Sequence, residues 1–456
     1  MFTLMLCAND FGLGRLFQTL FIFVSGGMNI AWSTGFNDYT NLSYNLYMNL
    51  CWFLAAIIGS LVGAVLTNKI RKKIFMLISS VLILIGGILF LALHTSFAAI
   101  MIARHLNGFA VGFAFVPTLV MGGEIVVKYM RGLVTSFVDA MSFAFGAFLQ
   151  ILYTACWSSE INANFNANQM HGLLCLIFST ISLTFAHFLI IESPVYLLLL
   201  GQEEAAIETL RRLQLPAEIT YETYQQLEEH KRYIAVSKAK TMSQSFADSV
   251  PALVKLCIFR GLVAMSFSLI VNFTLRTTSF NILHNLNAWP YIIFATSRWI
   301  GSLGGIFMMD SMGRKKPLNI SMLICAAMAI GVGVIYCDVH KLTRSTQMIV
   351  AIVFLIIHQL FAGIAVTSAS AYLSEGFPLA AKPYCISIVF SVEMLVHIII
   401  GSIYLQSTAI SDYFYVLGAF SLLFIAFSIL CLPETKNTSL YEAQFIFRGF
   451  SNRGFS

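Results

Sequence analysis

Long apolar stretches separated by short polar turns dominate this chain of 456 residues. A helix of about 20 apolar residues crosses the roughly 30 Å hydrocarbon core of a bilayer. Twelve stretches reach that length, and the pattern predicts an all-α membrane protein with twelve transmembrane helices. The predicted spans cover residues 16–35, 46–67, 74–94, 98–122, 132–155, 171–191, 256–276, 288–309, 317–337, 347–373, 384–406 and 412–432.

A single long polar segment divides these spans into two sets of six. We therefore predict an N-terminal six-helix half at 1–191, a linker at 192–255, a C-terminal six-helix half at 256–433 and a tail at 434–456. Two six-helix halves of this kind are typical of transporters built from parallel repeats.

The polar linker itself has a helical pattern. Ala206, Leu210 and Leu213 recur at helical spacing, and Glu208 precedes Arg212 by four residues. These features predict an amphipathic helix with a supporting ion pair. A second helix is predicted over 220–236, and we interpret the segment as a cap on the cytoplasmic face.

Short charged signatures at the span ends of the first half return in the second half at nearly constant separation. The matched pairs are Asn68 with Asp310, Glu124 with Glu375, Arg131 with Lys382, and Glu192 with Glu434. Internal duplication of this kind indicates a transporter whose solute site lies between two repeats.

The composition excludes several functional classes. With 58% hydrophobic and 11% charged residues the chain is far from a soluble globular protein. The net charge of +6 lies mostly in short clusters at span ends, which argues against a nucleic-acid partner. We expect no catalytic constellation, metal site or cofactor, and the nine cysteines show no metal-ligand spacing.

The basic residues also predict the orientation. Lys and Arg concentrate in the loops after spans 2, 4, 8 and 10, so the positive-inside rule places both termini and the linker in the cytoplasm. Asn41, in an Asn-Leu-Ser triplet, would then lie outside as a glycosylation site. A plasma-membrane glycoprotein is the expectation.

Five short signatures lie in order along the chain: Gly59 and Gly63 with the basic cluster to Lys73; Arg104 to Gly132; Glu192-Ser193-Pro194; Asp310 to Leu318; and Pro433 to Lys436. Together they resemble the sugar porter family of the major facilitator superfamily, which implies twelve helices in two halves, and they are similar to the signatures of insect glucose and trehalose carriers. The resemblance implies facilitated diffusion of a sugar by alternating access. It also implies a cytoplasmic gate formed by Glu124, Arg131, Glu192, Asp310, Arg314, Glu375 and Glu434.

The expected solute cavity departs from the family, whose members hold sugar hydroxyls with neutral amides. Four ionisable residues lie inside spans instead, and each costs roughly 2.5–3.5 kcal/mol in lipid, so they should face one another or a wet cavity. They are Asp139, Arg298, Glu393 and His397. Gln18, Asn29 and Asn272 are the remaining cavity candidates.

Two interpretations of these ions stay open: a structural ion pair of Arg298 with Asp139 or Glu393, or a charged binding site. Correspondingly, the sugar carrier has two alternatives. One is a carrier of a charged organic solute, or a proton-coupled carrier, using Asp139, Arg298 and Glu393. The other is a non-transporting sensor. Proton-coupled members usually carry an acid on span 1, and none occurs here.

Overall fold

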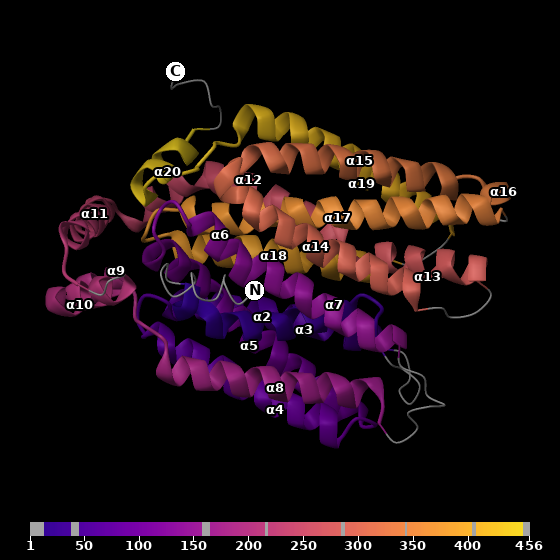
Figure 1. Ribbon diagram of the computed structural model, residues 1–456, viewed down its shortest axis with the longest axis horizontal. Helices are drawn as coiled ribbons and strands as arrows, with labels where there is room; N and C mark the ends of the chain where they lie inside the picture. Colours follow the sequence, from indigo (N-terminus) through magenta and orange to yellow (C-terminus); the bar gives the residue numbers. More distant parts are fainter. Residues whose placement is uncertain are drawn as a thin grey trace.

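The computed structural model describes residues 13–37, 45–156, 165–214, 218–283, 288–342, 344–403 and 407–449. Every regular element within these ranges is a helix. Twelve helical segments are long and apolar enough to span a membrane, which confirms the predicted all-α architecture. The two halves lie side by side with their long helices roughly parallel (Figure 1).

The helix bounds follow the predicted spans closely. The first half contains α2 (Leu13–Ser33), α3 (Leu46–Leu66), α4 (Lys72–Ala92), α5 (Phe97–Ile125), α6 (Arg131–Ser136), η2 (Phe137–Met141), α7 (Ser142–Cys156) and α8 (Ala167–Phe188). The second half contains α12 (Met242–Ser266), α13 (Leu269–Leu283), α14 (Trp289–Ser311), α15 (Lys315–Tyr336), α16 (Val339–Leu342), α17 (Ser345–Glu375), α18 (Lys382–Gly401) and α19 (Ser407–Cys431).

Two of the spans are interrupted near the interface between the halves. The fifth span passes through the π-helical turn η2, which contains Asp139 and joins α6 to α7. The seventh span breaks at Phe267 and Ser268, between α12 and α13. Helix α12 begins at Met242, well before the predicted start at 256, because Thr241 and Gln244 form a capping box there.

Glycines allow the close approach of paired helices in both halves. A Cβ atom at Gly112 of α5 would lie 2.0 Å from the carbonyl oxygen of Ala56 on α3. A Cβ atom at Gly301 of α14 would lie 2.0 Å from the carbonyl oxygen of Leu360 on α17. Hydrophobic attraction is weak between helices in lipid, so the close van der Waals packing that small residues allow stabilises such contacts instead.

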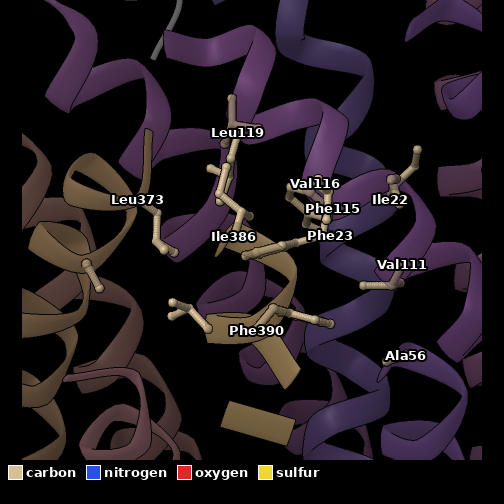
Figure 2. Close-up of a cluster of buried hydrophobic side chains, with 14 of the residues drawn as sticks. Ile22, Phe23, Ala56, Val111, Phe115, Val116, Leu119, Leu373, Ile386 and Phe390 are labelled. Carbon is tan, nitrogen blue, oxygen red and sulfur yellow. The ribbon is translucent and has the colours of Figure 1, made fainter. Parts of the chain in front are cut away.

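The halves meet at a buried apolar cluster beside the centre of the molecule. The rings of Phe115 on α5 and Phe390 on α18 are 4.2 Å apart between centroids. Figure 2 shows Ile386 and Phe390 of α18, with Leu373 of α17, facing first-half residues that include Phe115 and Leu119. Since Glu393 lies one turn beyond Phe390, this packing also positions the charged residues of α18.

One end of the bundle carries the short helices α9 (Pro194–Leu199), α10 (Glu203–Leu213), α11 (Tyr221–Lys238) and α20 (Leu440–Phe447) (Figure 1). We call this the linker end. The predicted linker ion pair is confirmed, with Arg212 Nε 2.6 Å from Glu208 Oε1. Tyr233 and Ile234 of α11 pack against Leu379 and Leu440, so the linker contacts the second half as well as the first.

Candidate functional site: a charged cavity between the halves

A small cavity lies between the two halves. Its free volume is about 50 Å³. A water molecule needs roughly 10–15 Å³ on this measure, so the cavity has room for only a few waters. Its wall combines aromatic and ionisable side chains from both halves, among them Phe115, Asp139, Phe143, Arg260, Phe267, Arg298, Phe390, Glu393 and His397.

An ion triad centred on Arg260 occupies one side of the cavity. The Arg260 guanidinium on α12 donates hydrogen bonds to Asp139 of η2 and, over 3.1 Å, to Glu393 of α18. Ser370 of α17 donates to the same Asp139 Oδ2 over 2.7 Å. All these side chains are buried. Because Asp139 belongs to the first half and its partners to the second, the triad connects the halves.

Arg298 occupies a different environment from Arg260. Its Nη1 donates to Gln359 Oε1 over 2.9 Å and to Ser266 Oγ over 3.3 Å, and its Cζ lies 4.9 Å from the Phe267 ring centroid. The predicted ion pair of Arg298 with Asp139 or Glu393 is therefore wrong. Arg260 binds both carboxylates, whereas the hydrogen-bond partners of Arg298 are neutral.

Four of the seven predicted cavity residues line this cavity: Asp139, Arg298, Glu393 and His397. The His397 ring stacks on Phe53 of α3 at 4.9 Å between centroids. Within the described residues, His397 Nδ1 has no hydrogen-bond partner. The cavity therefore offers an imidazole as well as the two guanidinium groups.

The other three predicted cavity residues lie elsewhere. Asn29 accepts a hydrogen bond of 3.4 Å from Arg104 Nη1, within the first half. Gln18 is buried in the same half, and its side chain has no hydrogen-bond partner among the described residues. Asn272 donates to Thr34 Oγ1 over 2.9 Å. None of the three is in the wall of the cavity.

Sequence reasoning missed Arg260, the centre of the triad. The predicted seventh span starts at 256, and Arg260 lies only four residues after that start, near a predicted membrane boundary, where arginines are common. Helix α12 instead begins at Met242, which places Arg260 deep inside the helix. The insertion cost that singled out Arg298 would have identified Arg260 too, had the start of the helix been recognised.

The duplicated signatures at the linker end form duplicated helix caps. The Glu192 carboxylate accepts from the backbone N–H of Lys72 over 3.0 Å, and the Glu434 carboxylate accepts from that of Arg314 over 3.0 Å. Each acid thus satisfies a free N–H group at the start of α4 or α15. Burial raises the pKa of Glu192, although Lys72 and the backbone donors oppose that rise.

The next signature residues repeat as well. Ser193 donates to Glu124, and Thr435 Oγ1 donates to Glu375 Oε2 over 2.6 Å. Each of these two contacts joins a helix of one half to the segment that follows the last span of the same half. Glu124, Glu192 and Glu434 therefore hold the helix ends of their own halves in place.

Three of the four remaining predicted gate residues connect the halves. Glu375 lies 4.0 Å from Arg131 Nη1 of the first half. Within the second half, Glu375 accepts a 3.0 Å hydrogen bond from Arg314 Nη2. Asp310 Oδ2 accepts from the backbone N–H of Leu133 over 3.2 Å. The contacts of Arg131 with Glu375 and of Leu133 with Asp310 join the two halves near the linker end, and they close that end.

The opposite end is bridged too. Asn272 of α13 donates to both the carbonyl and hydroxyl oxygens of Thr34, which follows α2 in the first half. The cavity thus lies between contacts at both ends. Asn41, the predicted glycosylation site, falls outside the described residues.

Comparison with known proteins places this geometry in context. A family model described as "Sugar (and other) transporter" matches residues 28–447. The galactose-proton symporter of Escherichia coli K12 is 23% identical over 418 residues, which cover 85% of this chain and 84% of the symporter. Human facilitated glucose transporter member 12 of solute carrier family 2 is 27% identical over 173 residues. That match covers 37% of this chain and only 26% of the human protein.

Solved structures share the fold over nearly the whole chain. The proton:xylose symporter XylE bound to 6-bromo-6-deoxy-D-glucose superposes with a TM-score of 0.77 at 17% identity, covering 95% of this chain and 99% of that one. The inward-open form of XylE from E. coli gives a TM-score of 0.64 at 19% identity, over 98% and 99% of the two chains. The arrangement of helices is thus more similar to the sugar-analogue complex than to the inward-open form.

Proposed function

Because the chain belongs to the sugar (and other) transporter family, we propose that it carries a sugar across a membrane by facilitated diffusion with alternating access. The observation that carries the proposal is the cavity between two repeated halves, whose wall contains ionisable side chains, with separate contacts closing each end. Breaking the contacts at one end while keeping those at the other would expose the cavity to one side at a time.

The environment of Arg104 supports facilitated diffusion rather than proton coupling. The span-1 residues that this buried arginine contacts are the amide Asn29 and the hydroxyl residue Ser33, whereas the family resemblance implies an acid on span 1 in proton-coupled members. An amide has no proton to release near neutral pH. Solute binding alone would then drive the change between the two open states.

The orientation and membrane remain part of the proposal. Lys69 and Lys316 are exposed near the linker end, in the loop before α4 and at the start of α15. Such basic loops favour the cytoplasmic side. We accordingly place the linker end and both termini in the cytoplasm, and the protein in the plasma membrane.

Uptake by purified protein in liposomes tests the function. We expect saturable uptake of at least one member of a panel of labelled hexoses, pentoses, disaccharides and sugar acids, with no alkalinisation of the medium accompanying net uptake of a neutral sugar. Protein-free liposomes give the background. Absence of saturable uptake across the panel would refute the sugar carrier, and proton movement in step with neutral sugar uptake would refute facilitated diffusion.

A further inference from the structure

Arg298 is a buried cation held in place by neutral groups. Gln359 and Ser266 accept from its Nη1, and Gln359 is itself anchored by a 2.8 Å hydrogen bond from Nε2 to the Ser266 carbonyl oxygen. Within the described residues no carboxylate lies within ion-pair distance of Arg298, and its Nε and Nη2 make no hydrogen bond. The side chain is 8% exposed and lines the cavity.

The carboxylates of the cavity are already engaged elsewhere. Asp139 and Glu393 both bind Arg260, so two acids share one guanidinium. Hydrogen bonds to Gln359 and Ser266 and the contact with the Phe267 ring restore only part of the several kcal/mol of hydration that a buried cation loses when it has no carboxylate at ion-pair distance. An arginine fixed in that state beside a solute cavity fits a site where the solute itself supplies the negative charge.

The geometry of the open edge of Arg298 identifies the chemistry. Nε–H and the adjacent Nη2–H lie along one side of the planar guanidinium, and this pair of donors matches the two oxygens of a carboxylate. The third nitrogen, Nη1, is the one that Gln359 and Ser266 hold. The donors suited to bidentate recognition are thus the ones left open.

We propose that Arg298 binds the carboxylate of an acidic sugar, of the uronic or aldonic acid class. This inference rests on the proposed transport function and narrows its substrate. The triad carries one surplus negative charge, so the carboxylate must point towards Arg298 and the hydroxyl groups towards Asp139. Asp139 Oδ1, which is buried and has no hydrogen-bond partner among the described residues, accepts from a solute hydroxyl in this orientation.

Uptake of glucuronate and of glucose into proteoliposomes provides the test. We expect glucuronate uptake to be saturable. An inside-positive membrane potential should accelerate it, because glucuronate is an anion. Any glucose uptake should be unaffected by the potential, because glucose is neutral. Arg298→Gln should lower the ratio of glucuronate uptake to glucose uptake at least tenfold. If glucose is not carried, glucuronate uptake itself should fall at least tenfold. Arg298→Lys keeps the charge without the bidentate edge and should lie between. Arg276→Gln, an exposed arginine of α13, is the matched control.

The outcomes separate this inference from the transport function. If neutral sugars are taken up but glucuronate, galacturonate and gluconate are not, the inference is overturned and the sugar-carrier function stands. Retention of acidic-sugar uptake in Arg298→Gln would also overturn it. No uptake of either class would refute both. If Arg298→Gln fails to fold, the wild-type melting temperature decides: glucuronate should raise it more than equimolar glucose, and an equal or smaller rise refutes the inference.

Discussion

Replacing Asp139 by Asn tests whether the ion triad holds the two halves together. Asp139 Oδ2 accepts hydrogen bonds from Arg260 and Ser370, both in the second half. Asn has the same size and can still accept a hydrogen bond, but it removes the charge. Arg260 keeps its 3.1 Å contact with Glu393, so no cation is left isolated. The substitution therefore weakens mainly the connection between the halves.

The expected magnitude follows from the burial of these groups. A hydrogen bond to a charged group contributes about 1.5–3 kcal/mol to a folded arrangement. A change of about 1.4 kcal/mol alters an equilibrium constant tenfold. Loss of the Asp139 charge should thus shift the equilibrium from the closed to the open states by roughly 10- to 150-fold.

Pulsed electron resonance between spin labels can measure this shift. Exposed Lys69 and Lys316 provide one label pair at the linker end, and exposed Leu46 and Ser402 provide another at the opposite end. We expect Asp139→Asn to increase a longer-distance population at one end or both. Distances identical to those of the wild type at both ends would refute the idea that the triad holds the halves together.

A matched substitution controls for the general effect of removing an acid. Asp248 forms partly exposed ion pairs with Lys240 and Arg448, near the linker end. Exposed or partly exposed pairs contribute little, typically 0–1 kcal/mol. Asp248→Asn should therefore leave both distance distributions close to those of the wild type, and an equal shift in this control would contradict the assignment to the triad.

Two further predictions concern helix packing and a helix cap. Gly112→Ala places a methyl group 2.0 Å from the Ala56 carbonyl oxygen, and we expect overpacking to lower the melting temperature, at a cost of about 1–3 kcal/mol or more. Gly304→Ala, whose Cβ meets nothing within 4 Å, should match the wild type; equal losses would contradict the packing argument. Burial raises the pKa of Glu192 above its ordinary 4.5, so the folded state binds the proton more tightly than the unfolded state. The free energy of unfolding should therefore fall as pH rises from about 4.5 through the pKa of Glu192 in the folded state. Glu192→Gln should remove this decrease in melting temperature with pH, and an unchanged decrease in the variant would contradict the assignment to Glu192.

The fold could be predicted because a bilayer imposes its requirements locally. Each span needs a sufficient run of apolar residues whatever its neighbours are, and predicted spans such as 46–67 agree with the observed Leu46–Leu66 to within a residue. The seventh span was the exception. Its polar beginning, from Met242, is helical through capping and packing rather than through apolar composition.

The gate was partly predictable for a similar reason. Duplicated acids mark duplicated helix ends, and Glu192 and Glu434 do cap corresponding helices. The sequence did not show which gate residues contact the other half and which cap helices within their own half. Contacts in space assign Arg131, Asp310 and Glu375 to the interface between the halves. Arg314 and the other acids of the signature make their contacts within their own half.

The sequence by itself determined that Asp139, Arg298, Glu393 and His397 lie within membrane spans, because their presence in apolar stretches is a matter of composition. Only the tertiary structure decided how they pair. Arg260 is 121 positions from Asp139 and 133 from Glu393, and three helices bring these residues together. The interaction energy of two buried charges depends on their distance in space and not on their separation along the chain. That is why Arg260 binds both acids, and Arg298 faces the cavity with only neutral partners.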